Sequence, residues 1–309
     1  MRLVFMGTPT FAVPVLAGLH ALDGTEVVGI YTPPDRPAGR GRRSQSSPVK
    51  DFAGEEGLPV FQPASLRPAE VQAGLEELKP DVIVVAAYGK FLPPPVLELP
   101  PLGCLNIHPS LLPRHRGPSP VATTILEGHQ TTGVTLMLLD QGMDTGPVIA
   151  RTKYRLRGDE TAQDLTETLF DLGGALLHDS LPRWQAGELR AQPQDDAIAT
   201  VSRKLERADG LADWSMTADE LERRSRAFTP WPGLFTDWNG SGVKLVEVTA
   251  LDGDGLPGLV AETGDLAAPV AVGTRRGLLG LKTVQLEGKR AVPTGDFLRG
   301  APSFIGAQL

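Results

Sequence analysis

Residues 81–88 constrain the fold more than any other stretch, because they are apolar almost without interruption. They read Asp-Val-Ile-Val-Val-Ala-Ala-Tyr, and no polar side chain falls between the first residue and the last. A strand with one face in water alternates apolar and polar residues, whereas a strand covered on both faces does not. The segment therefore predicts a central strand of a mostly parallel sheet that is covered on both faces.

The N-terminal segments predict the same architecture. Residues 2–6 read as a strand, Gly7 opens a turn, and Thr10 can cap a helix over residues 13–19, where apolar side chains recur at helical spacing. This order of strand, glycine turn and helix begins an open, Rossmann-like α/β sheet. Further strands are expected at 26–32, 58–62, 103–108, 133–140 and 147–154, and helices at 49–57, 68–78, 119–128 and from 161 onward.

The pattern changes after residue 200. A helix-start signature at Thr217 and Glu220 is followed by short apolar runs without a helix between them. Such runs predict a small five-stranded, OB-like β-barrel of the type that binds nucleic acids. The expected strands lie at 234–238, 243–251, 258–262, 269–274 and 278–286. Because residues 187–200 are polar and non-periodic, we expect a catalytic domain at 1–188, a linker at 189–204 and the barrel domain at 205–309.

Composition limits the cellular setting and the partners. Cys104 is the only cysteine, which excludes an internal disulfide framework and fits a reducing cytoplasm. The N-terminus is broken too soon by Gly7 and Pro9 for a signal peptide, and no apolar run approaches the roughly 20 residues of a membrane span. The five histidines are scattered, so no metal site is expected. A net charge of −7 does not favour nucleic acid, so RNA binding would need a local basic patch.

Residues 33–50 supply such a patch. They contain many prolines and glycines, have no hydrophobic period, and carry the cations Arg36, Arg40, Arg42 and Arg43. Loops longer than about 12 residues are usually functional or disordered. This long exposed loop is interpreted as an arm that grips phosphates, the alternative being a solvated segment with no partner.

Three polar residues form the candidate catalytic group. Asn106 and His108 are two positions apart, so their side chains share one face of an extended strand. An amide donor beside an imidazole suits a carbonyl oxygen that gathers negative charge. Asp144, on a later loop, can stabilise the imidazolium form of His108 or relay a proton through water, and the sequence leaves both roles open.

Several blocks that span most of the chain resemble the folate-dependent formyltransferases, in particular the family that formylates methionyl-tRNA. The blocks are Gly7–Pro9, Pro34–Gly41, Asn106-x-His108, Ser110–Gly117 and Ala227–Pro232. The resemblance implies that Asn106, His108 and Asp144 are catalytic and that 10-formyltetrahydrofolate is the co-substrate. It implies folate contacts at Ser110, Leu111, Leu112 and Pro113. It also implies initiator methionyl-tRNA as the acceptor, with Arg36, Arg40, Arg42 and Arg43 placed along its acceptor stem.

Other functions remain open from the residues alone. A formyltransferase acting on a sugar nucleotide or on glycinamide ribonucleotide would use the same polar group, but it has no obvious need of a basic loop and a barrel. A non-catalytic RNA-binding protein leaves Asn106, His108 and Asp144 unexplained. A nicotinamide dehydrogenase is a weaker alternative, because Gly7 lacks the Gly-x-Gly-x-x-Gly spacing of a dinucleotide site. A monomer is expected.

Overall fold

The computed structural model describes residues 1–38 and 43–309, and the side chains of residues 36–44 are outside the description. Contacts between Cα atoms divide the chain into two compact units. Unit 1 consists of Met1–Pro120, Thr131–Arg155 and Thr166–Ser202, and unit 2 of Val121–Gln130, Leu156–Leu165 and Arg203–Leu309.

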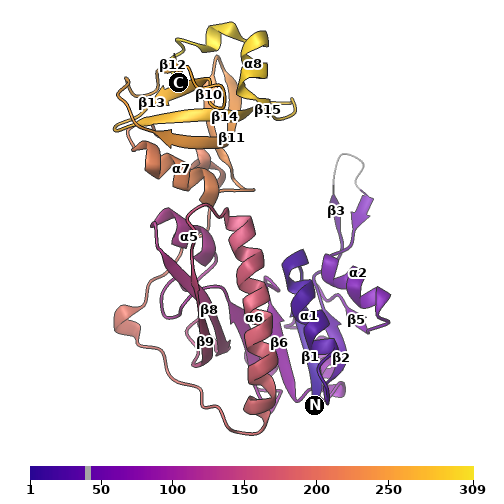
Figure 1. Ribbon diagram of the computed structural model, residues 1–309. Coiled ribbons are helices and arrows are strands. Elements are labelled where there is room, and N and C mark those ends of the chain that lie inside the picture. Colours follow the sequence, from indigo (N-terminus) through magenta and orange to yellow (C-terminus); the bar gives the residue numbers. More distant parts are fainter. Residues whose placement is uncertain (39–42) are drawn as a thin grey trace. The chain divides into compact units, whose positions relative to one another are not determined.

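Unit 1 is built on a seven-stranded sheet in the order β5-β2-β1-β6-β7-β8-β9. The first five strands in this order are parallel to one another, whereas β8 is antiparallel to both β7 and β9. The predicted mostly parallel sheet is therefore confirmed (Figure 1). Its strands are β1 (Arg2–Gly7), β2 (Glu26–Tyr31), β5 (Val60–Phe61), β6 (Val82–Ala86), β7 (Cys104–His108), β8 (Thr131–Leu138) and β9 (Val148–Arg155).

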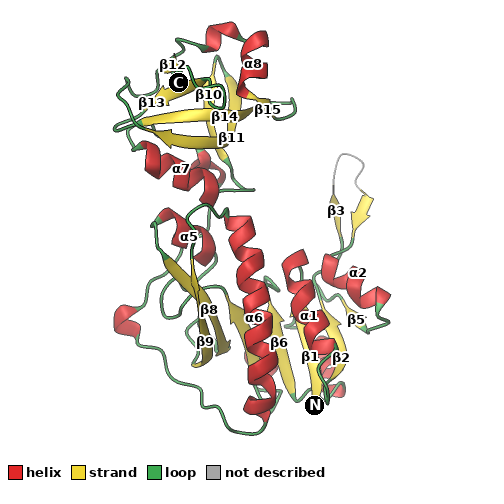
Figure 2. Cartoon of the chain, in the orientation of Figure 1, coloured by secondary structure: helices red, strands yellow, loops and turns green. Residues whose placement is uncertain are grey.

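Helices α1 (Val13–His20) and α6 (Ala162–Gln185) lie over one face of this sheet (Figure 2). The core on its other face includes residues of α3 (Ala69–Glu77), so both faces are covered, as the apolar run at 81–88 predicts. On β1, Leu3 and Phe5 pack into a core with residues of α1 and α6, whereas Val4 and Met6 pack into a second core that includes Leu75 of α3. Alternate side chains of one strand thus enter two cores. The helical segments of unit 1 are η1 (Thr10–Ala12), α1 (Val13–His20), α2 (Pro48–Glu55), α3 (Ala69–Glu77), α4 (Pro94–Leu97), most of α6 (Ala162–Gln185) and η2 (Asp196–Ile198), whereas α5 (Pro120–Leu126) belongs to unit 2 except for its first residue.

The turn after β1 differs in detail from the expectation. Thr10 is the first residue of η1 rather than a cap, and neither η1 nor α1 has a side-chain cap. Gly7 is required for close packing, because a Cβ there would lie 2.6 Å from the Phe5 ring and 2.9 Å from the Ala86 carbonyl oxygen. The glycine thus lets β1 approach β6, which accounts for it without a nucleotide.

The basic segment 33–50 is not irregular throughout. Its strand β3 (Arg36–Ala38) pairs antiparallel with β4 (Arg43–Gln45) in a separate two-stranded sheet. At its base, Lys50 Nζ donates to Asp35 at 2.6 Å and Gln62 Nε2 donates to the same carboxylate at 2.7 Å. The expectation of a structureless loop is therefore wrong for β3 and β4, because cross-strand pairing at 36–38 and 43–45 needs no hydrophobic period.

Unit 2 contains a separate antiparallel sheet in the order β10-β11-β14-β13-β12, with β15 beside β14. The five expected strands are confirmed and β15 is additional. Its core includes Trp214, Leu221, Leu245 and Phe304. The elements are η3 (Arg207–Gly210), α7 (Ala218–Ala227), β10 (Leu234–Trp238), β11 (Ser241–Leu251), β12 (Val260–Glu262), β13 (Val270–Gly273), β14 (Leu278–Leu286), β15 (Val292–Pro293), α8 (Thr294–Gly300) and η4 (Pro302–Phe304).

Candidate active site

Strand β7 brings Asn106 and His108 to one face of the sheet. Leu105 and Ile107 point to the opposite face, where they join the core formed with α1 and α6. Cys104 shares the face of Asn106 and His108, and burial raises the pKa of its thiol to about 12. The thiol is thus an inert part of the core, and Asn106 and His108 are the polar groups that β7 delivers at its carboxyl end.

His108 is buried between two hydrogen-bond acceptors. Its Nε2 lies 2.9 Å from the backbone oxygen of His115, and its Nδ1 lies 3.6 Å from Oδ1 of Asp144. The second distance is that of an ion pair rather than a hydrogen bond. A carbonyl and a carboxylate can only accept, so whichever ring nitrogen carries a proton faces an acceptor.

Asp144 lies in the turn between β8 and β9 with φ of 56°, in the left-handed region. Its Oδ2 accepts a hydrogen bond from the backbone N–H of Gly117 at 2.8 Å, which leaves Oδ1 facing His108. Aspartate tolerates this backbone conformation better than most residues but still at a cost. The turn therefore depends on bonds from neighbouring segments to hold the carboxylate in place.

Asn106 is half-buried, and its side-chain amide has no hydrogen-bond partner among the residues that the structure describes. An amide in this state can donate from Nδ2 to an oxygen of a bound ligand. Asn106 thus shares a face of β7 with His108, and His108 in turn faces Asp144 from a separate segment.

The turn 110–113 is packed tightly against β8. The Ser110 hydroxyl donates to the Arg114 carbonyl at 2.7 Å, and Thr135 Oγ1 both donates to the Ser110 carbonyl and accepts from the Leu112 N–H. Leu112 is buried beside Met137 and Val148 of the sheet. These bonds give the turn a structural role, and contact of Ser110, Leu111, Leu112 and Pro113 with folate stays a prediction.

The four arginines assigned to tRNA are only partly placed. Arg36 begins β3 and Arg43 begins β4, so both belong to the hairpin. Arg40 and Arg42 lie outside the described residues. Their contact with RNA stays a prediction.

The segment after α6 is bonded to the loops that carry His115 and Asp144, a contact that the sequence did not predict. Gln194 Nε2 donates to the carbonyl oxygens of Asp144 at 2.8 Å and Gly146 at 2.7 Å. Thr200 Oγ1 accepts from the N–H of His115 at 2.8 Å. Nothing in the polar, non-periodic composition of 187–200 indicates these bonds. The proposed bounds 1–188, 189–204 and 205–309 remain a prediction, and residues 192–202 are bonded within unit 1.

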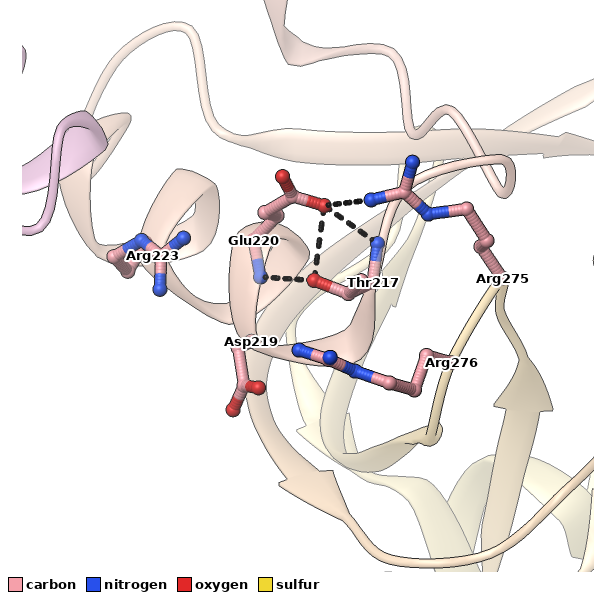
Figure 3. Close-up of a pocket in the computed structure, with 6 residues that line it drawn as sticks. All are labelled: Thr217, Asp219, Glu220, Arg223, Arg275 and Arg276. Carbon is pink, nitrogen blue, oxygen red and sulfur yellow. Dashed lines mark hydrogen bonds and ion pairs between the residues drawn. The ribbon is translucent and has the colours of Figure 1, made fainter.

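Unit 2 has a pocket of about 510 Å³ at the start of α7 (Figure 3). It gathers Arg223, Arg275 and Arg276. Glu220 accepts from the backbone N–H of Thr217 at 2.8 Å, which is the main reason that its pKa lies below the usual range, and it also pairs with Arg275 at 3.4 Å. The lining residues are Thr217, Asp219, Glu220, Arg223, Arg275 and Arg276.

The pocket keeps one excess positive charge. Three guanidinium groups face two carboxylates, and among the described residues Arg223 Nε is buried without a hydrogen-bond partner. Arg224 Nε is likewise buried without a partner in the described part of the chain, but Arg224 and Arg226 donate through their terminal nitrogens to the backbone oxygens of Asp209 and Glu160. The pocket suits an anion, and all its residues belong to unit 2, whereas Asn106, His108 and Asp144 belong to unit 1.

Over the part of the chain that the structure describes, no helix has both the length and the apolar character needed to cross a membrane.

Comparisons with known proteins agree with this arrangement. Residues 1–181 match the family Formyl transferase, and residues 204–302 match Formyl transferase, C-terminal domain. The methionyl-tRNA formyltransferase of Roseiflexus sp. (strain RS-1) is 47% identical over 303 residues, which are 97% of this chain and 92% of that protein.

Two solved structures share the fold. HypX from Aquifex aeolicus in complex with tetrahydrofolic acid superposes with a TM-score of 0.64 at 20% identity, over 96% of this chain and 47% of that chain, so this chain spans about half its length. The N-formyltransferase from Helicobacter canadensis in complex with folinic acid and dTDP-3-aminofucose superposes with a TM-score of 0.66 at 17% identity, over 91% of this chain and 99% of that chain.

The resemblance seen in the sequence is thus confirmed over both domains, and the full-length similarity separates this chain from formyltransferases that share only its fold. The chain belongs to the methionyl-tRNA formyltransferase family.

Proposed function

We propose that this protein transfers the formyl group of 10-formyltetrahydrofolate to the amino group of methionine carried by initiator tRNA, in the cytoplasm and as a monomer. The observation that carries the chemistry is the convergence of Asn106, His108 and Asp144 at the end of β7. The names of the full-length relatives support the acceptor. The folate bound to the structurally similar HypX supports the donor class.

The reaction requires charge stabilisation at one carbon atom. The neutral methionyl nitrogen attacks the formyl carbon, and the carbonyl oxygen becomes an oxyanion. Asn106 Nδ2 donates to this oxyanion, and the His108 ring, whose two nitrogens already face acceptors, stabilises it by its positive charge when protonated. The bond from the formyl carbon to N10 then breaks, N10 takes up a proton and the attacking nitrogen loses one.

Asp144 assists His108 through its negative charge. Its Oδ1 lies 3.6 Å from the ring, where it can stabilise positive charge that develops on the imidazole during the reaction, and the contact can shorten when substrates bind. In the alternative role, Asp144 accepts the amine proton through a water molecule. Both roles need the carboxylate to remain where the Gly117 N–H holds it.

RNA binding is assigned to two cationic regions. One is the β3–β4 hairpin with Arg36, Arg40, Arg42 and Arg43, where guanidinium groups suit phosphates and base edges. The other is the pocket of unit 2 with Arg223, Arg275 and Arg276. Local patches of this kind allow a chain with a net charge of −7 to bind an anionic polymer.

The decisive experiment is formylation of initiator methionyl-tRNA by the purified protein with 10-formyltetrahydrofolate. Elongator methionyl-tRNA, an amino-sugar nucleotide and glycinamide ribonucleotide serve as competing acceptors under the same conditions. We expect efficient transfer to the initiator alone. Preferential transfer to a small amine would favour the other formyltransferase function, and folate binding without transfer to any acceptor would refute the proposed reaction.

A further inference from the structure

Residues 182–203 lie between the two matched family ranges, yet part of this segment is bonded to the loops of the candidate active site. Gln194 of this segment contacts the turn that carries Asp144, and its side chain is half-buried in unit 1. The two hydrogens of its amide go to the carbonyl oxygens of Asp144 and Gly146. Gln194 therefore holds the backbone of the turn that presents the Asp144 carboxylate.

The remaining polar atom of this side chain is also used. Gln194 Oε1 accepts from Arg116 Nε at 3.0 Å, and Arg116 also pairs with Asp196 at 2.7 Å. An amide with every bond satisfied has one orientation, because reversing it would set a donor against Arg116 and an acceptor against two carbonyl groups. The position thus specifies glutamine by its hydrogen-bond pattern rather than by its polarity alone.

The same segment also supports the other side of His108. Thr200 Oγ1 accepts from the His115 N–H, and the His115 carbonyl in turn accepts from His108 Nε2. Gln194 acts on the Asp144 side of the imidazole and Thr200 on the His115 side. Both acceptors that flank the His108 ring are therefore held by residues of one short segment.

We propose that Gln194 is a positioning residue for the His108–Asp144 pair, a role that rests on the proposed catalytic function of that pair. It stabilises the left-handed conformation of Asp144 and thereby the 3.6 Å separation between Oδ1 and His108 Nδ1. Without its two donors the turn relaxes and the carboxylate leaves the ring, although Gln194 touches no reacting atom.

The variant Gln194→Glu isolates this role, because it keeps the acceptor for Arg116 and removes the two donors. Gln192→Glu is the matched control: it makes the same chemical change at an exposed side chain two positions away, where the structure records only backbone bonds to Val148. Both variants are assayed as full-length proteins for formylation of methionyl-tRNA, with thermal unfolding as the test of folding.

We expect Gln194→Glu to lower kcat by about 10–10²-fold, as small displacements of catalytic groups do. The KM values should stay unchanged. Gln192→Glu should match the wild type in both. If Gln194→Glu does not fold, Gln194→Met, which introduces no charge, takes its place.

Asp144→Asn, measured beside these variants, separates the two levels of the proposal. If Asp144→Asn retains full activity, the catalytic role of Asp144 fails, and the inference about Gln194 fails with it. If Asp144→Asn is impaired but Gln194→Glu behaves like Gln192→Glu, only the positioning role is overturned. In the Asp144→Asn background, Gln194→Glu should add no further loss, since residues that act through one another are not additive.

Discussion

The carboxylate of Asp144 faces the His108 ring through one oxygen and accepts the Gly117 backbone N–H through the other. A single side chain thus joins the turn after β8 to the loop after β7, and its orientation toward His108 is fixed by a backbone group.

His108 and Asp144 should behave as a unit. Each of His108→Ala and Asp144→Asn is expected to lower kcat by about 10²–10⁴-fold, in the range of general acid–base catalysis. The double variant should lose little more than the worse single variant, because coupled groups are not additive. Single-turnover formylation rates test this, and losses that multiply would show that the two residues act independently.

Asn106 should contribute one oxyanion donor. Asn106→Ala is expected to lower turnover by about 10²–10³-fold, roughly 2.7–4 kcal/mol of transition-state stabilisation, with little change in KM. Steady-state kinetics together with the thermal unfolding midpoint provide the measurement. A folded Asn106→Ala protein with near-normal kcat would remove this residue from the catalytic group.

The hairpin arginines should divide into two kinds. Arg42→Ala and Arg43→Ala, if they bind phosphates, should each weaken all tRNAs alike and reduce the salt slope by about 1. Arg40→Ala should weaken the binding of initiator tRNA by roughly 1–3 kcal/mol and affect other tRNAs less. The assay is kcat/KM for initiator and elongator methionyl-tRNA at two salt concentrations.

Arg67→Ala is the control for the hairpin, since Arg67 is exposed and no side-chain contact is recorded for it in the described part of unit 1. If replacing Arg36, Arg40, Arg42 and Arg43 together changes neither kcat/KM nor its salt dependence, the hairpin has no role in tRNA binding.

The pocket of unit 2 should contribute to RNA affinity but not to chemistry. Arg276→Ala is expected to raise KM for methionyl-tRNA and leave kcat at saturation unchanged, because no residue of the proposed catalytic group lies in unit 2. Arg290→Ala, an exposed arginine of the same unit that does not line the pocket, should have a smaller effect. Equal effects of the two variants would argue against a specific role of the pocket.

The Asp35 carboxylate at the base of the hairpin should make the free energy of unfolding depend on pH. The hydrogen bond from Lys50 and then that from Gln62 hold the pKa of Asp35 below its ordinary value of 3.8. Because the pKa of Asp35 is lowered in the folded state, the ionised carboxylate stabilises the fold. This contribution to the free energy of unfolding is present above about pH 4 and is lost as the pH falls through the pKa of the folded state.

Accordingly, Asp35→Asn should lower the free energy of unfolding at neutral pH, and the difference from the wild type should shrink as the pH falls below about 4. Asp23→Asn, at an exposed position in the same unit, is the control. Urea unfolding at several pH values measures both variants. A difference that is independent of pH would mean that the Asp35 carboxylate does not stabilise the folded state through its charge.

Local sequence pattern predicted most elements of both units. The uninterrupted apolar run at 81–88 indicated a strand buried on both faces. The neighbouring strand β1 shows why: its alternate side chains enter two different cores, one on each face of the sheet. Thr161–Asp164 and Thr217–Glu220 indicated helix starts, and both pairs exchange hydrogen bonds between side chain and backbone. These features depend on residues within a few positions of one another.

The hairpin and the support of the active site could not be predicted in this way. Strand pairing of Arg36 with Gln45 relies on backbone groups, which every sequence carries. Gln194 reaches Asp144 across 50 positions of the chain, and Thr200 reaches His115 across 85. No local period encodes contacts of this range.

The sequence by itself therefore determined which chemical groups are present: the amide, the imidazole and the carboxylate at 106, 108 and 144, the strands and helices that carry them, and the family to which they belong. Only the tertiary structure decided which oxygen of Asp144 faces His108, that both ring nitrogens of His108 meet acceptors, and that a polar connecting segment holds those acceptors. The reason is that residue types follow from the chain alone, whereas hydrogen-bond geometry depends on how distant segments pack.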